Sequence, residues 1–227
     1  MSLHHVESHG LLCFPGRGPE AIDRMPTTPE KRRLRVETIT AILNLGEADR
    51  LEQERRILSR LAELPSYRRA ETVLLYIKAF PEEIDVSPLL VDALAAGKRL
   101  ICPRVDRPSR MLVLHEIRDP AADLQPGTLG IPEPRLDVPT VAPEALDWAL
   151  APGVAFDASC NRVGRGAGHY DRLLPRLRKE VEVWAAAFDV QVRDDLPVEP
   201  HDAPLTGVVT ATRVLIRPQS LHEAAGG

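Results

Sequence analysis

A glycine-rich segment between residues 162 and 172 holds the residue types best suited to chemistry in this chain. It reads Arg162-Val163-Gly164-Arg165-Gly166-Ala167-Gly168-His169-Tyr170-Asp171-Arg172. Alternating glycines let the backbone turn its N–H groups towards an anion at close range. The apolar spacing that follows predicts a helix, whose N-terminus adds partial positive charge. With Arg162, Arg165 and Asp171, a hard oxygen ligand suited to Mg²⁺, the segment contains the parts of a nucleotide triphosphate site.

The glycine spacing matches no common nucleotide-binding motif. The segment lacks the Gly-Lys-Ser/Thr of a P-loop, and its glycines are spaced differently from those of a dinucleotide fingerprint. On spacing alone, a flexible surface turn is an equally good interpretation. Pro175 falls where the following helix should run, and we expect it to kink or end that helix.

The elements predicted around this segment alternate between helices and strands. Helices are expected at 29 to 43, where Thr28 caps the first turn, at about 47 to 63, and at about 86 to 97. Apolar runs predict strands at 72–77, 99–102 (stopped by Pro103), 111–117, 148–151, 183–188 and 207–215. Residues 119 to 146, rich in proline and glycine, are expected to be a loop region. The alternation predicts an α/β fold: a largely parallel, mixed sheet with helices on both faces, in a single three-layer domain.

Composition narrows the class of protein further. The chain has 227 residues, a net charge of −4 and 4% aromatic residues, which argues against a dedicated nucleic-acid binder. No apolar run approaches the roughly 20 residues of a membrane helix. Three scattered cysteines are too few for a disulfide framework or a zinc site, so we expect a cytoplasmic protein. Residues 1–28 are predicted to be a disordered extension, 29–216 the α/β domain, and 217–227 a loose tail.

The residues on either side of the glycine-rich segment resemble one known family. Pro152-Gly153-Val154-Ala155-Phe156-Asp157, followed by residues 162–172, is similar to the P-G-x-A-F-D and R-L-G-x-G-x-G-Y-Y-D-R signature of the 5-formyltetrahydrofolate cyclo-ligases, also called methenyltetrahydrofolate synthetases. Further short matches lie in the family's order, namely Lys31-x-x-Leu34-Arg35, Glu83-Ile84-Asp85, Gly130-Ile131-Pro132-Glu133-Pro134 and Val198-Glu199-Pro200-His201-Asp202. The resemblance covers about residues 29 to 215.

The resemblance implies an ATP-dependent enzyme of one-carbon metabolism. The family converts 5-formyltetrahydrofolate into 5,10-methenyltetrahydrofolate and releases ADP and phosphate. In its accepted mechanism the formyl oxygen attacks the γ-phosphate, an N5-iminium phosphate forms, and N10 then displaces phosphate. Such chemistry needs positioning and charge neutralisation more than a protein nucleophile.

The family's site residues carry over by position. The resemblance assigns ATP contacts to Lys31, Arg35 and the loop residues Arg162, Val163, Gly164, Arg165, Gly166, Ala167, Gly168, His169 and Tyr170. It assigns folate contacts to Glu83, whose carboxylate suits the paired N–H donors of a pterin, to Lys78, and to the loop residues 165–169. Arg165 and Tyr170 are the candidate catalytic residues, and Asp171 and Asp202 the candidate Mg²⁺ ligands.

Three departures from the family pattern keep a second function open. The usual glycine before the signature is Cys160, the first tyrosine of Y-Y-D is His169, and the threonine after E-x-D is Val86. A diverged, non-catalytic relative that binds folate or a nucleotide would fit these changes. Apart from the family, His201 is more often a structural histidine, and Cys160 has no evident partner that would make it a nucleophile. We expect a monomer whose partner is a small-molecule folate, with neither nucleic acid nor membrane.

Overall fold

The computed structural model describes residues 28–127 and 130–218. The predicted extension at 1–28, apart from Thr28, and most of the predicted tail lie outside these residues. Thr28 itself is the N-cap residue of the first helix. The main sheet has the strand order β13-β12-β10-β7-β1-β2-β3-β6. Its strands are β1 (Thr72–Leu74), β2 (Arg99–Asp106), β3 (Met111–Ile117), β6 (Thr140–Val141), β7 (Trp148–Leu150), β10 (Glu182–Ala186), β12 (Gly207–Val209) and β13 (Val214–Ile216).

The middle of this sheet is parallel and its edges are antiparallel. Strands β12, β10, β7, β1 and β2 pair in parallel, whereas β13, β3 and β6 join by antiparallel pairing. The predicted mixed, largely parallel sheet is therefore confirmed.

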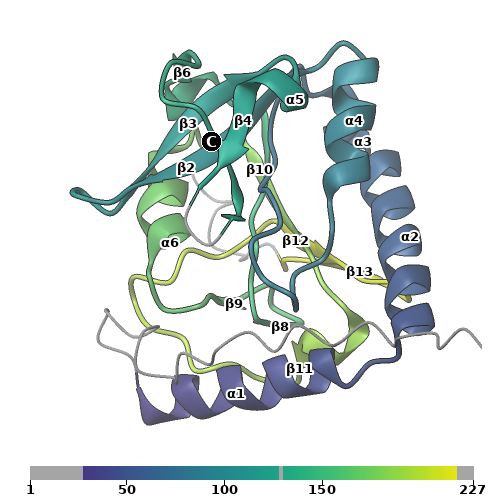
Figure 1. Ribbon diagram of the computed structural model, residues 1–227. Coiled ribbons are helices and arrows are strands. Elements are labelled where there is room, and N and C mark those ends of the chain that lie inside the picture. The colour runs from purple at the N-terminus through teal and green to yellow at the C-terminus, as the bar shows by residue number, and fades with distance from the viewer. Residues whose placement is uncertain (1–27, 128–129, 219–227) are drawn as a thin grey trace, which may run out of the picture.

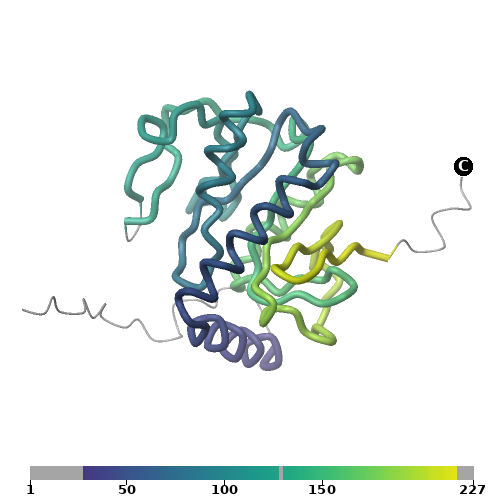
Figure 2. The backbone as a smooth tube through the Cα atoms, turned by 90° about the vertical axis from the view of Figure 1, so that its right-hand side faces the viewer, coloured from purple at the N-terminus to yellow at the C-terminus, as the bar shows by residue number. Residues whose placement is uncertain are grey.

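Helices cover both faces of the sheet, as Figure 1 and the turned view in Figure 2 show. Helices α2 (Glu47–Glu63), α3 (Pro65–Arg69) and α4 (Ser87–Ala95) lie on one face, and α6 (His169–Leu173) lies on the other. Alternate strand residues point to opposite faces. Val73 and Leu100 accordingly pack with Ile57 of α2, whereas Leu74 packs with Leu173 of α6. The strands are buried on both faces, as their unbroken apolar runs predict.

The remaining elements are helix α1 and several short strands and helices. A small second sheet has the order β11-β8-β9. Helix α1 (Pro29–Leu43) contacts β8 and a short 3-10 helix, η5. The bounds of these elements are β8 (Ala155–Asp157), β9 (Arg162–Val163), β11 (Val192–Arg193), β4 (Leu124–Pro126), β5 (Pro132–Pro134), α5 (Pro120–Asp123), η3 (Pro143–Ala145), η4 (Leu174–Arg176) and η5 (Asp189–Gln191).

The two long N-terminal helices have the predicted bounds. Thr28 accepts a hydrogen bond from the Lys31 N–H, and Pro29 occupies the first turn of α1. The predicted effect of Pro175 is also confirmed, since α6 ends at Leu173 and the 3-10 helix η4 follows. The region 119–146, predicted to be a loop, contains the short elements α5, β4, β5, β6 and η3.

Pro103 does not stop its strand, contrary to the prediction. Strand β2 continues to Asp106 by antiparallel pairing with β3, where Pro103 lies opposite Leu114. The parallel pairing with β1 ends instead, after the Leu75 N–H donates to the Ile101 carbonyl. The next donor of that ladder would be the N–H of residue 103, which proline lacks. The proline therefore shortens β1, which ends at Leu74 rather than at residue 77.

The last predicted strand, 207–215, is a hairpin of β12 and β13. Its turn is built by the Thr210 hydroxyl, which accepts hydrogen bonds from the Thr212 and Arg213 N–H groups.

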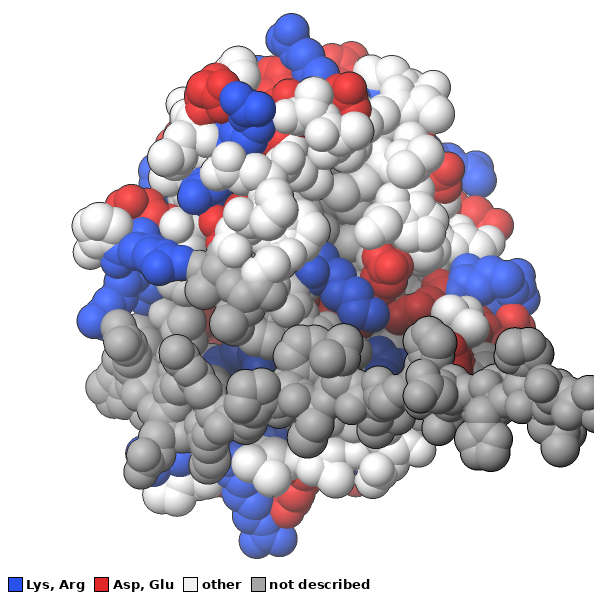
Figure 3. All heavy atoms as spheres, in the orientation of Figure 1, with Lys and Arg blue, Asp and Glu red and all other residues white. Residues whose placement is uncertain are grey.

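Within the described residues, no helix is long and apolar enough to span a membrane. On the face seen in Figure 3, acidic and basic side chains are interspersed among the described residues rather than gathered by sign.

Candidate active site at the glycine-rich loop

The glycine-rich loop lies between β9 and α6 and has the backbone that its glycines permit. Gly166 and Gly168 have φ angles of 103° and 66°, in the region that L side chains rarely adopt. Gly168 is the N-cap residue of α6. A methyl group at Gly164 would lie 2.8 Å from a nitrogen of Arg162. The glycines thus serve both the turn and the close packing beneath it.

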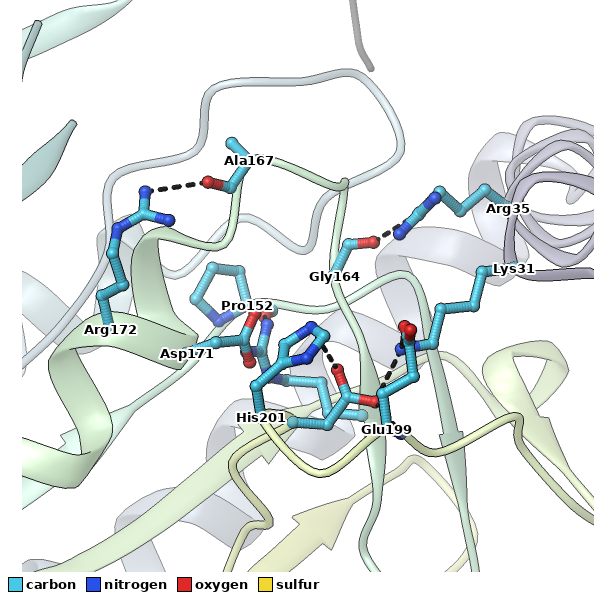
Figure 4. A network of polar contacts seen from close by, with 11 residues as sticks. Lys31, Arg35, Pro152, Gly164, Ala167, Asp171, Arg172, Glu199 and His201 are labelled. Atoms are coloured by element: carbon cyan, nitrogen blue, oxygen red, sulfur yellow. Dashed lines mark hydrogen bonds and ion pairs between the residues drawn. The ribbon is translucent and has the colours of Figure 1, made fainter. Parts of the chain in front are cut away.

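The loop borders a pocket built from three distant parts of the chain. Helix α1 contributes Lys31 and Arg35, and the Arg35 Nε donates to the Gly164 carbonyl at 2.8 Å (Figure 4). The other lining residues are Val163, Gly164, Gly166, Gly168, Asp171, Glu199, His201 and Asp202. Cationic side chains, open backbone and carboxylates therefore meet in one place.

Lys31 is the buried cation of this pocket. It is 3% exposed, and its Nζ lies 2.6 Å from both Glu199 Oε2 and Asp202 Oδ2. Asp202 Oδ2 also accepts a hydrogen bond from the Glu199 N–H at 2.7 Å, which fixes the turn. The structure thus brings Lys31 and Asp202 together, as the resemblance implied.

Arg162 lies below the loop rather than in the pocket. Its guanidinium is buried, donates to Asp171 Oδ1 at 2.6 Å and to the Pro152 carbonyl at 3.1 Å, and lies over the Tyr170 ring. The family resemblance implied that Arg162 contacts ATP. The side chain instead holds Asp171, which lines the pocket itself.

Glu199 and His201 were not predicted as site residues. Their ligand atoms and that of Asp202 lie within 4.8 Å of one another. The signal was present in the sequence, because Glu199 and Asp202 are acidic residues three apart in the same Val-Glu-Pro-His-Asp segment. Carboxylate oxygens are the ligands that Mg²⁺ prefers, so Glu199 and Asp202 suit that ion in type. Asp171 lines the same pocket but is not part of this group.

Glu83 lies in the turn after β1 and holds that turn together. Its Oε2 accepts hydrogen bonds from the Ala79 N–H at 2.7 Å and the Phe80 N–H at 3.2 Å. Burial raises the pKa of this carboxyl, and the two N–H donors lower it in part. Neither Glu83 nor Lys78 is among the residues that line the pocket at the loop. The Lys78 Nζ lies 4.0 Å from Glu54, beside a separate hollow against α2.

Tyr170 connects the glycine-rich loop with the Glu83 turn. Its side chain is buried, and its hydroxyl has no hydrogen-bond partner among the described residues. Burial raises the pKa of this phenol, and the nearby charge of Glu83 raises it further. A buried hydroxyl that lacks a partner is costly, so this atom is an unsatisfied polar group at the end of the glycine-rich loop.

Arg165 points away from the pocket, although it was predicted to contact ATP. Its guanidinium lies over the Phe80 ring, 3.5 Å from the centroid, and pairs with the carboxylate of Glu82. Burial lowers the pKa of Arg165 to about 10, so the side chain remains charged at neutral pH.

The three departures from the family pattern have structural explanations. Cys160 is buried with a φ angle of 60°, which a glycine would adopt without strain. Val86 is the N-cap residue of α4 and provides no side-chain cap, which a threonine could provide. His169 Nδ1 lies 2.9 Å from the Arg110 carbonyl, so it ties the β2–β3 turn to the start of α6. Burial lowers the pKa of His169, which favours the neutral ring.

The fold and this site define an α/β protein whose glycine-rich loop faces a pocket of mixed charge. The family model described as "5-formyltetrahydrofolate cyclo-ligase family" matches residues 27–211. The 5-formyltetrahydrofolate cyclo-ligase of Escherichia coli K12 is 35% identical over 165 residues, 72% of this chain and 90% of that protein. The Haemophilus influenzae protein of the same name is 28% identical, covering 80% of this chain and 98% of the relative.

Two solved structures that are similar to this chain are those of 5,10-methenyltetrahydrofolate synthetases. The solution structure of Aquifex aeolicus 5,10-methenyltetrahydrofolate synthetase superposes with a TM-score of 0.73 and 34% identity, over 84% of this chain and 95% of that one. A Mycoplasma pneumoniae 5,10-methenyltetrahydrofolate synthetase, at 21% identity and a TM-score of 0.65, supports the fold. The chain belongs to the 5-formyltetrahydrofolate cyclo-ligase family. The resemblance and the enzyme class inferred from the sequence are therefore confirmed.

Proposed function

We propose that this protein converts 5-formyltetrahydrofolate into 5,10-methenyltetrahydrofolate in a reaction that consumes ATP, requires Mg²⁺ and releases ADP and phosphate. One observation carries the proposal most strongly: the pocket at the glycine-rich loop. There, two cationic side chains of α1 face the open backbone of the loop and the carboxylates of two further segments. This combination suits a polyphosphate together with a divalent cation.

The proposed ATP site follows from that arrangement. Lys31 and Arg35 neutralise phosphate charge from the side of α1, and the N–H groups of residues 163–168 receive the phosphate oxygens. Asp171 and Asp202 would hold Mg²⁺, with Glu199 close enough to assist. The ion would neutralise charge on the phosphates and help to orient them.

The proposed folate site lies beside the loop, towards the Glu83 turn. Glu83 offers a carboxylate to the N–H donors of the pterin, and Tyr170 offers its unpaired hydroxyl. Residues 165–169 would complete this wall. Lys78 stays a predicted folate contact, although its own position against α2 does not support the role.

The reaction proposed for this site transfers phosphate before it closes a ring. The formyl oxygen attacks the γ-phosphorus, the bond to the β–γ bridging oxygen breaks, and ADP leaves. The N5 lone pair moves into a C=N bond, which gives an N5-iminium phosphate. N10 then attacks the formyl carbon and loses its proton, and the C–O bond breaks to release phosphate. Arg165 and Tyr170 are the residues proposed to stabilise the charge and orient the formyl group.

A turnover assay separates this function from the non-catalytic alternative. Purified protein is mixed with MgATP and 5-formyltetrahydrofolate, and ADP and the methenyl product are both counted. We expect one ADP for each methenyl group, and no product when either ATP or Mg²⁺ is withheld. Folate or nucleotide binding without product would favour the alternative of a diverged, non-catalytic relative. The changes at Cys160, His169 and Val86 are the observations that support that alternative. The predicted monomeric state and cytoplasmic location stay predictions.

A further inference from the structure

The Arg165 side chain is held by a second segment of the chain, the turn that contains Phe80 and Glu82. Its guanidinium lies over the face of Phe80 at 3.5 Å and pairs with Glu82, and Arg165 is not among the residues that line the pocket. The Glu82 side chain is 8% exposed and that of Arg165 is 22% exposed. We call Phe80 and Glu82 the arginine cradle.

The cradle belongs to a turn that is already fixed. The Glu83 N–H donates to the Phe80 carbonyl at 3.0 Å, and the Glu83 carboxylate accepts from the Ala79 and Phe80 N–H groups. A turn closed by both backbone and side-chain bonds presents Phe80 and Glu82 in one orientation. The arginine is therefore received by a preformed surface.

The glycine-rich loop is thus restrained from two sides. On the side of α1, Arg35 donates to the Gly164 carbonyl at 2.8 Å. A second restraint comes from the arginine cradle, which holds Arg165. This arginine lies between Gly164 and Gly166 in the loop. A planar guanidinium that is both stacked and ion-paired is fixed in orientation, which a lysine in its place would not be.

We propose that Glu82 is a positioning residue that sets the place of Arg165 and joins the glycine-rich loop to the Glu83 turn. This inference rests on the proposed function, since it assigns the two joined segments to the ATP phosphates and to the pterin. Glu82 itself contacts neither ligand. It acts by holding Arg165, and with it the glycine-rich loop, in a fixed position relative to the Glu83 turn.

The test compares Glu82→Gln, Glu82→Asp and Arg165→Met with a matched control, Glu52→Gln. Glu52 is an exposed acid on α2 that pairs with Arg55 and Arg56, far along the chain from the loop. Two measurements are made. The first is amide hydrogen exchange in the ligand-free protein at the end of the loop, where the Arg172 N–H donates to the Gly168 carbonyl. The second is kcat and the KM for each substrate.

We expect Glu82→Gln to speed exchange in the loop by about tenfold, because a freed loop opens more often. It should lower kcat by about tenfold or more and leave both KM values within about threefold. Glu82→Asp, which keeps the charge, should recover most of both effects. A double variant that combines Glu82→Gln with Arg165→Met is also made. Because Glu82 acts through Arg165, this double variant should be no slower than Arg165→Met alone. Glu52→Gln should change nothing.

Loop exchange and kcat in Glu82→Gln equal to those in Glu52→Gln would overturn the proposal. Additive losses in the double variant would overturn it too, because Glu82 would then act independently of Arg165. If the wild-type protein makes no product, the proposed function fails on its own, and the exchange measurement still decides whether Glu82 orders the loop. A melting temperature for each variant separates this local effect from global unfolding.

Discussion

Arg162 and Asp171 lie near opposite ends of the glycine-rich motif and form an ion pair. The Arg162 guanidinium donates a hydrogen bond to Asp171 Oδ1 at 2.6 Å. Both groups are largely withdrawn from water, with side chains 3% and 18% exposed. The arginine therefore orients the carboxylate that faces the pocket. This pair explains why the motif needs an arginine nine residues before its aspartate.

The Arg162–Asp171 pair should stabilise the protein as well as the site. Arg162→Lys keeps a positive charge but loses the fork that reaches both Asp171 and the Pro152 carbonyl. Losing a hydrogen bond between charged groups costs about 2 kcal/mol in the free energy of unfolding, which urea denaturation measures. Arg176→Lys, at an exposed position close by, is the control. Equal stability of the two variants would contradict the role given to Arg162.

Lys31 should matter for ATP more than for folate. Lys31→Met removes the cation between Glu199 and Asp202, so one positive charge fewer would face the phosphates. We expect the KM for ATP to rise about tenfold and the KM for the folate to change little. Arg33→Met on the same helix, where the arginine is exposed and paired with Glu37, serves for comparison. If both variants give the wild-type KM for ATP, Lys31 is not an ATP contact.

The ionised carboxylate of Glu83 should lower the stability of the folded protein at neutral pH. Burial raises its folded pKa above the ordinary 4.5, so the folded state binds more protons than the unfolded one between these two pKa values. Stability contributed by this group therefore falls as pH rises through that window. Glu83→Gln removes the charge, so its gain in melting temperature over wild type should be larger near pH 7.5 than near pH 4.5.

The same Glu83→Gln variant should bind folate more weakly, because an amide accepts from the pterin N–H groups less strongly than a carboxylate does. Glu30→Gln, at an exposed position in α1, controls for the loss of one negative charge. The stability prediction has its own contradicting outcome. If the difference in melting temperature between Glu83→Gln and wild type is the same at pH 4.5 and pH 7.5, the burial of the Glu83 carboxylate is not its cause.

Cys160 should be replaceable by glycine. Its φ angle of 60° disfavours a side chain, and burial raises the pKa of its thiol to about 11, so the thiol stays protonated and unreactive at neutral pH. Cys160→Gly should be more stable than Cys160→Ala by about 1 kcal/mol, because only alanine keeps the strain. Both variants should keep wild-type kcat. A large loss of kcat in both would give the thiol a part in the reaction.

Local signals in the sequence predicted most elements of the fold. The Thr28 cap and Pro29 placed α1, and apolar runs placed the buried strands. Pro103 was misjudged because its effect depends on which neighbour β2 has at that point, and strand neighbours are not written in local sequence. The hairpin of β12 and β13 was missed for a similar reason, since its turn depends on hydrogen bonds of a threonine hydroxyl.

Family motifs indicated which residues would lie near one another at the candidate site, but not which way each side chain would point. Lys31 and Asp202 were expected in one site and do meet. That Arg165 turns towards Glu82, and that His169 holds the Arg110 carbonyl, depends on contacts between segments far apart in the chain. Spacing within one segment contains no information on such contacts.

The central claim is that the formyl oxygen attacks the γ-phosphate of ATP at the glycine-rich loop. It is tested most directly by supplying 5-formyltetrahydrofolate labelled with ¹⁸O in the formyl group, together with MgATP, and measuring the label in the released phosphate by mass spectrometry. The account predicts one labelled oxygen in each phosphate formed with methenyl product, and neither labelled phosphate nor product with Asp171→Ala. Unlabelled phosphate accompanying methenyl product, or ATP consumption without product, would contradict it.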